Sequence, residues 1–138
     1  MTFEELASTL PNRFHDAELS SFEMNYSSRV LRLNLEVWIG SMGDPPETRE
    51  KYRPATVTCR DAAYLVVEPP DVSYLRFAEA DSVSIDTGEG RLKNAGVSLP
   101  DPPAGTTLTW MFMMSWNSFI FFAAGDSLLE WTGEEVFY

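Results

Sequence analysis

The stretch LRLNLEVWI, residues 31–39, decides the class of fold. Aliphatic side chains fill its odd positions, whereas Arg32, Asn34, Glu36 and Trp38 fill the even ones. Successive side chains of a β-strand point to opposite faces of the sheet, so this two-residue period places all the aliphatic side chains on one face. The sequence therefore predicts a sheet with one face buried in a core.

The preceding residues, 17–26, predict the partner of this strand. Their apolar positions change parity between Leu19 and Phe22. A β-bulge at Ser20–Ser21 accounts for the change, because a bulge inserts one extra residue into a strand. Turn-forming residues follow at 25–29, so the two strands are expected to form a hairpin.

A short helix is expected before this hairpin. Thr2 and Glu5 have the Ser/Thr-x-x-Glu spacing of a capping box. Phe3 begins an apolar face that continues three and seven residues later, as on a helix. Pro11 ends the helix, because it has no backbone N–H and disfavours helical geometry in the residue before it.

The rest of the chain reads mainly as strands. Residues 55–67 keep one apolar parity, interrupted at Asp61, which predicts one long strand or two collinear strands with a bend. Residues 107–114 and 119–124 are apolar on both parities, so both of their faces should be covered. Shorter strands are expected at 72–77, 83–85 and 128–131, with a turn at 88–90 and loops at 40–54 and 94–105.

These elements predict one mainly β domain spanning residues 1–138, or α+β if the single short helix is counted. The strands favour an antiparallel architecture, either a curved sheet, a sandwich or a barrel-like fold. The alternation does not distinguish among the three, because each of them has one apolar and one polar face per strand.

The composition is acidic. The chain of 138 residues has 21 aspartates and glutamates against 10 lysines and arginines, a formal net charge of −11. Nucleic acids and anionic membrane surfaces are both bound through clustered lysine and arginine, so the charge argues against either partner. A basic protein partner is compatible with it. Nothing in the residues indicates an oligomeric state.

Residues 105–125 contain no charged side chain, which makes them a candidate for a membrane-spanning segment. A spanning helix needs about 20 apolar residues, whereas polar side chains between 115 and 118 interrupt this run, so two β segments fit it better. The chain begins without a secretory signal, and a single cysteine excludes an internal disulfide. We therefore expect a soluble cytoplasmic protein.

His15 and Asp16 are the first candidates for catalysis. His15 is the only histidine, and histidine titrates near neutral pH. An adjacent carboxylate would orient it, or share a metal with it, in a small hydrolase or metal-dependent enzyme. Neighbouring residues of a strand point to opposite faces, however, so a structural histidine at the start of a strand is the favoured interpretation.

Other chemical sites are poorly supported. Cys59 has the parity of the buried residues, and as a nucleophile it would need a base, for which His15 is the only imidazole. One histidine and one cysteine do not suit zinc, and Asp81, Asp86 and Glu89 lack the calcium-loop pattern. Paired carboxylates would serve glycoside hydrolysis, but 21 acidic residues make such pairs unspecific. No cofactor and no metal are predicted.

Aromatic and methionine side chains are concentrated at residues 110–122. They predict either the central hairpin of the core, which is favoured, or the pocket of a carrier for small apolar ligands. The region after Lys93 has no basic residue. Its acidic and aromatic side chains are candidates for contacts with a basic protein partner: Asp126, Glu130, Trp131, Glu134 and Glu135.

The segment FHDAEL, residues 14–19, followed by a hairpin, resembles the start of many small uncharacterised bacterial proteins. Some of these are grouped with the immunity proteins of toxin systems. The resemblance covers about the first third of the chain. It implies a bacterial cytoplasmic protein and neutralisation of a toxin, and it implies no catalytic residue.

The incomplete catalytic sets favour a non-enzymatic binding or protein-interaction module, immunity-protein-like in one version. Two alternatives stay open: an enzyme centred on His15 and Asp16, and a carrier of apolar ligands.

Overall fold

The computed structural model describes residues 1–71, 73, 81–86, 98–114 and 116–138. Its helices and strands follow in the order α1 (Phe3–Ser8), β1 (Ala17–Asn25), β2 (Val30–Trp38), α2 (Pro46–Arg49), β3 (Lys51–Arg60), β4 (Tyr64–Val67), β5 (Asp81–Asp86), β6 (Thr107–Met113), β7 (Ser118–Ala124), β8 (Asp126–Trp131) and β9 (Val136–Phe137). Neither helix of the described part is long and apolar enough to span a bilayer.

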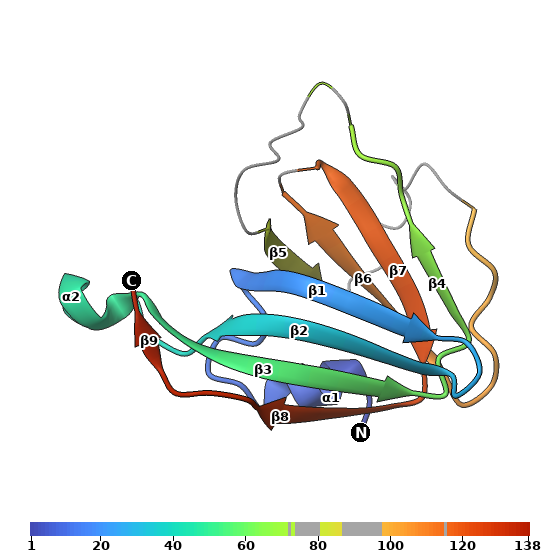
Figure 1. The fold of residues 1–138 in the computed structure, drawn as a ribbon, viewed down its shortest axis with the longest axis horizontal. Helices are drawn as coiled ribbons and strands as arrows, with labels where there is room; N and C mark the ends of the chain where they lie inside the picture. Colours follow the sequence, from blue (N-terminus) through green and yellow to red (C-terminus); the bar gives the residue numbers. More distant parts are fainter. Residues whose placement is uncertain (72, 74–80, 87–97, 115) are drawn as a thin grey trace.

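The strands form one antiparallel sheet in the order β4-β7-β6-β5-β1-β2-β3-β8, with β9 beside the start of β3 (Figure 1). The predicted mainly β class is therefore confirmed. Of the architectures left open, a barrel does not form, because the sheet is not closed.

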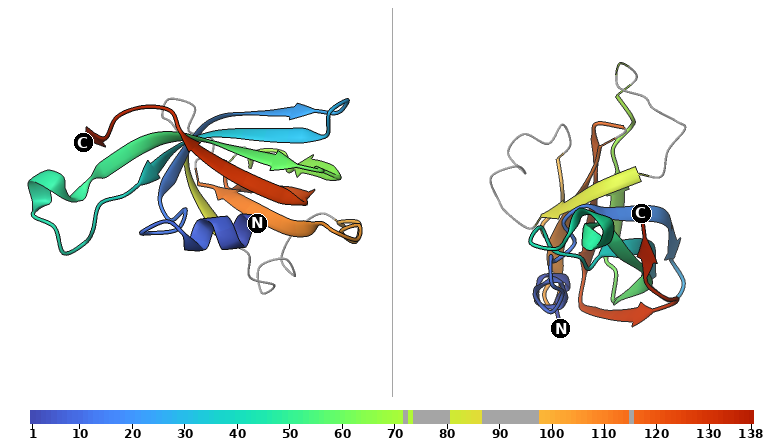
Figure 2. Two further views of the ribbon diagram at one scale, coloured as in Figure 1. Left: turned by 90° about the horizontal axis from the view of Figure 1, so that it is seen from below. Right: turned by 90° about the vertical axis from the view of Figure 1, so that its left-hand side faces the viewer.

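The sheet bends so that its two halves surround one core (Figure 2). We call β1, β2, β3 and β8 the first half-sheet and β4, β7, β6 and β5 the second. The side chain of each odd residue from Leu31 to Val37 is buried, and Met111, Ile120 and Phe122 of the second half-sheet belong to the same core cluster. The surface of the first half-sheet that points away from this core is its outer face.

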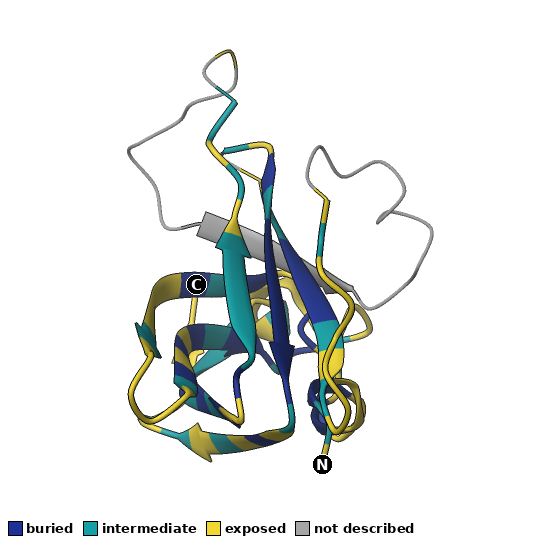
Figure 3. Cartoon of the chain, turned by 90° about the vertical axis from the view of Figure 1, so that its right-hand side faces the viewer, coloured by how far each residue is buried: buried dark blue, intermediate teal, exposed yellow. Residues whose placement is uncertain are grey.

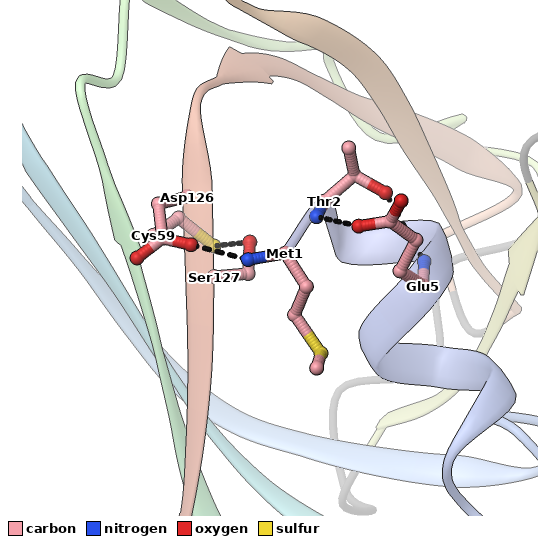
Figure 4. A network of polar contacts seen from close by, with 6 residues as sticks. All are labelled: Met1, Thr2, Glu5, Cys59, Asp126 and Ser127. Carbon is pink, nitrogen blue, oxygen red and sulfur yellow. Dashed lines mark hydrogen bonds and ion pairs between the residues drawn. The ribbon is translucent and has the colours of Figure 1, made fainter.

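Helix α1 packs against this core. Thr2 and Glu5 form both hydrogen bonds of the predicted capping box, shown in Figure 4. The ring of Phe3 stacks on Phe14 at 4.9 Å and meets the edge of Phe122 at 5.4 Å, measured between ring centroids. The predicted apolar face of the helix is therefore the face that the core buries.

The predicted hairpin and bulge are both present. Leu19 pairs with Leu35, and Ser21 pairs with the next residue of β2, Asn34, so Ser20 is the extra residue. On the N-terminal side of the bulge, the pairing of Leu19 with Leu35 continues with Glu18 directly opposite Glu36.

The region around Asp61 corrects the prediction of a long or collinear strand. β3 pairs with β2 and β8, whereas β4 pairs with β7 at the other end of the strand order. Asp61 adopts a left-handed conformation, with φ of +53°. The backbone N–H of Ala62 then donates to Arg29 and that of Ala63 to Ala123. These contacts turn the chain from one half-sheet to the other.

Two elements were missed by the sequence analysis. Residues 46–49 of the expected loop form α2, which follows Pro45 and extends beyond the sheet with the start of β3 (Figure 2). The second is β9, which is too short to show a period of its own. The expected strand at 72–77 and turn at 88–90 lie outside the described residues, apart from Ser73.

Strands β6 and β7 are covered on both faces, as predicted (Figure 3). Met111 and Phe122 point into the shared core, whereas Trp110 and Phe121 are buried on the opposite face. On that face Phe119 lies 5.7 Å from Trp110, 5.1 Å from Phe112 and 5.7 Å from Phe121, measured between ring centroids. The aromatic run is thus the central hairpin of the second half-sheet.

Candidate functional site

A groove with a volume of about 250 Å³ lies on the outer face of the first half-sheet. It is lined by Glu18, Ser20, Asn34, Leu35, Glu36, Pro54, Ala55 and Thr132. Glu18 comes from the start of β1 and Glu36 from the end of β2, and the bulge sets the register that makes them direct cross-strand partners. Carboxylates that face each other across two strands repel, so this pairing needs an explanation beyond stability.

The pKa of Glu18 is raised in this pair. Burial raises the pKa of Glu18, and the charge of Glu36 and a hydrogen bond between the two side chains raise it further. Glu18 therefore keeps its proton to a higher pH than an ordinary glutamate does. A shifted pKa in a groove is a mark of functional sites.

Tyr138 closes one end of this arrangement. Its hydroxyl lies 3.0 Å from each carboxylate oxygen of Glu36 and donates to them, which raises the pKa of Tyr138. Its ring forms a T-shaped contact with the Tyr52 ring, with 5.6 Å between the ring centroids. Its backbone N–H donates to the carbonyl oxygen of Glu50 at 2.9 Å. In Figure 1 the start of β1, the end of β2 and the C-terminal residue lie at the same side of the sheet.

The raised pKa of Tyr52 reflects its burial and the carboxylates around it at this end of the first half-sheet. Burial raises its pKa to about 12, with further contributions from the carboxylates of Glu50, Glu18 and Asp16. We call Asp16, Glu18, Glu36, Tyr52 and Tyr138 the acidic–aromatic site.

Of the predicted catalytic pair, Asp16 belongs to this site and His15 lies at its margin. The imidazole is exposed, its Nε2 lies 3.5 Å from Asp16 Oδ2, and its ring centroid lies 6.4 Å from that of Trp38. His15 and Asp16 come from the turn just before β1, where Asp16 has φ of +55°. His15 does not line the groove.

Three of the residues predicted to contact a partner, Asp126, Glu130 and Trp131, lie on β8. Asp126 accepts a hydrogen bond from the amino group of Met1 at 2.5 Å (Figure 4). It lies opposite Arg60, at the other end of β3 from Tyr52. Glu130 is exposed on the outer face, opposite Thr56 of β3.

Trp131 ends β8, and Glu134 and Glu135 lie between β8 and β9. Trp131 is half-buried, and the guanidinium carbon of Arg53 lies 4.9 Å from its ring centroid. Glu135 forms an ion pair with Lys51 at 3.2 Å, and Glu134 is exposed. The five predicted residues are therefore spread along β8 and the segment after it, and do not form one patch.

None of the comparisons with protein-family models, curated proteins and solved structures found a match. The resemblance to immunity proteins thus stays a prediction. The site has to be interpreted from its geometry.

Cys59 behaves as a buried apolar residue, as expected. Its side chain is inaccessible to solvent, and the hydroxyl of Ser127 donates to its sulfur at 3.5 Å (Figure 4). Burial raises the pKa of the thiol to about 11. The thiolate, which is the nucleophilic form, is therefore scarce at neutral pH.

The acidic residues of the described part do not include three that are placed to hold a metal ion together. Asp81 and Asp86 stand at opposite ends of β5, and Glu89 lies outside the described residues.

The geometry of the site suits cation binding better than hydrolysis. A glycosidase needs two carboxyl groups on either side of the bond to be cleaved, about 5 Å or more apart. Glu18 and Glu36 instead stand side by side as cross-strand partners on one face of the sheet. Such a pair is well placed to accept several hydrogen bonds from a guanidinium or ammonium group. The ring of Tyr52 adds a face for cation–π contact.

Glu18, Glu36 and Tyr138 were not among the site residues predicted from the sequence. The bulge places Glu18 opposite Glu36 only because Asn25 pairs with Val30, and the turn signal at 25–29 does not specify that pair. No local pattern points from Tyr138 to Glu36, since the two residues are 102 positions apart.

Proposed function

We propose that this protein is a non-enzymatic binding module that recognises a basic protein through the outer face of the first half-sheet. The observation that carries the proposal is the Glu18–Glu36 pair in the groove. In the part of the chain that the structure describes, neither carboxylate forms an ion pair with a lysine or arginine. A cationic side chain from a partner would supply the missing compensation.

The distribution of charge over the outer face supports the same proposal. Towards the hairpin turn Glu23 is opposite Arg32, and at the far end of β3 Arg60 is opposite Asp126. These pairs balance each other, whereas Glu18 and Glu36 add negative charge without a basic cross-strand partner. The net charge of −11 would in addition steer a basic partner towards the protein.

In the immunity-like version of this proposal the basic partner is a toxin. The segment that carries the resemblance, residues 14–19, includes both Asp16 and Glu18 of the acidic–aromatic site. The segment of resemblance therefore overlaps the proposed site at these two residues.

The test is binding to the product of the neighbouring gene, measured by calorimetry with the full chain. We expect a complex that weakens steeply between low salt and about 0.5 M NaCl, because screening shortens the range of charge attraction. Glu18→Gln combined with Glu36→Gln should weaken it about tenfold or more. Glu4→Gln combined with Glu47→Gln removes the same charge from two exposed helical positions and should have little effect.

The absence of a complex at low salt would contradict the proposal. Equal weakening by the two double variants would also contradict it, because net charge would then replace the site as the cause.

A further inference from the structure

We infer that strand β9 and Tyr138 form a strap over the acidic–aromatic site, and that an arginine or lysine side chain of a basic partner opens it by displacing the Tyr138 hydroxyl from Glu36. The inference rests on the proposed function, and adds to it a contact within the chain that competes with the partner.

The first support is the way Tyr138 uses the carboxylate. Its hydroxyl stands 3.0 Å from both oxygens of Glu36, the position that a guanidinium or ammonium donor would take. A hydrogen bond from a neutral hydroxyl to a carboxylate is weaker than one from a charged donor. A cation can therefore replace Tyr138, whereas an acidic or neutral ligand would gain nothing beside two carboxyl groups.

The second support is the weak attachment of the strap. β9 consists of Val136 and Phe137 and pairs only with Tyr52 and Lys51. The side chains of the strap are largely exposed, with Tyr138 at 65% of its full accessibility. A segment with few buried apolar contacts opens locally at little cost.

The third support is a firm anchor just before the strap. The N–H of Thr132 donates to Pro54 at 2.9 Å, and Arg53 Nε donates to the carbonyl oxygen of Gly133 at 2.9 Å. Gly133 packs so closely on Pro54 that a Cβ there would lie 2.8 Å from the proline ring. Residues 134–138 can therefore detach while β8 stays in the sheet.

Opening would expose the chemistry that the partner needs. It frees the carboxylate of Glu36 and uncovers the part of the Tyr52 ring that Tyr138 contacts. It also breaks the ion pair between Lys51 and Glu135, which leaves Glu135 available to a second basic side chain.

The test uses a short arginine-rich peptide as the probe and the full chain. Tyr138→Phe removes the hydroxyl and keeps the ring on Tyr52, so this variant should bind the peptide about three- to tenfold more tightly than the unaltered chain. Tyr26→Phe, in an exposed residue of the hairpin turn, is the matched control and should bind as the unaltered chain does. Hydrogen exchange of the Tyr138 amide, which is bonded to Glu50, reports the strap directly and should speed up when the peptide binds.

The two proposals fail in different ways. If the peptide binds but Tyr138→Phe leaves its affinity unchanged, or if the Tyr138 amide keeps its protection in the complex, the strap is overturned and the binding function stands. If no variant binds the peptide at low salt, the proposed function fails and the strap inference falls with it.

Discussion

Glu18 shows how a single side chain can be placed against the stability of the fold. It is half-buried, faces a second glutamate in register, and has a pKa raised first by burial and then by that neighbour. Evolution of a stable sheet alone would favour a neutral or basic residue here. The loss of stability caused by the two facing glutamates is consistent with a role of Glu18 in binding, since binding sites commonly contain groups that destabilise the free protein.

Glu18→Gln is therefore expected to stabilise the protein at neutral pH. The folded state holds its proton more tightly than the unfolded state, so stability falls as pH rises from the unfolded pKa through the raised folded one. The gain should be about 0.2–1 kcal/mol at pH 7 and should vanish below about pH 4, where the carboxyl is protonated in both states. Urea unfolding at the two pH values measures it.

Glu134→Gln is the control for this prediction, because it removes the same charge from an exposed residue outside the strands. A gain of equal size in the control would assign the effect to net charge and contradict the role of the pair.

Cys59 should be unreactive while the protein is folded. With a pKa of about 11, only about a thousandth of the thiol is ionised at pH 8, and burial blocks access as well. Iodoacetamide should leave the native protein unlabelled over hours and label it fully in denaturant, as measured by mass spectrometry. Fast labelling of the native protein would show that the sheet around Cys59 opens.

At the scale of the element, the bulge in β1 accommodates Ser20 as one residue without a partner in β2. Without the extra Ser20, residues 19 and 21 would be consecutive partners of 35 and 34, so the faces and the pairing of Glu18 with Glu36 would persist. The bulge is thus a local addition to the hairpin.

Deleting Ser20 should leave the protein folded, with a loss of about 1–2 kcal/mol from the changed twist and the lost hydrogen bond to the Asn34 carbonyl oxygen. Deleting Asn34 from β2, where every residue has a partner, should shift one side of the hairpin by one position and expose its apolar residues. Circular dichroism and thermal unfolding distinguish the two. Equal tolerance of both deletions would contradict the assigned register.

At the scale of the whole molecule, the two half-sheets depend on one core. Leu33 lies in the first half-sheet and Phe122 in the second, and both are fully buried in the same cluster. Phe3 of α1 contacts Phe122 directly, so the helix joins the second half-sheet to that core. Each half-sheet on its own would expose its apolar face to water.

The chain is therefore expected to unfold in one cooperative step, as a single domain should. Leu33→Ala and Phe122→Ala should each lower stability by about 2–5 kcal/mol. Fluorescence and circular dichroism should give the same midpoint within each variant. A variant in which one probe changes before the other would show that the halves unfold separately, which the shared core forbids.

The sequence by itself determined the properties that depend on local spacing. The two-residue period of 31–39, the bulge beside Leu19 and the capping box of Thr2 and Glu5 all appear as predicted, because strand faces and helix starts depend on residues close along the chain.

Only the tertiary structure decided where the strands go and what the outer face carries. The apolar parity shared across Asp61 is the same whether β3 and β4 continue together or separate, and the bonds from Ala62 and Ala63 to distant carbonyls separate them. The site depends on such long-range placement too, since Tyr138 reaches Glu36 only after β8 has returned along β3. The alternation of apolar and polar residues indicates which face of a strand is buried. It contains no information on which distant strand lies beside that strand in the sheet.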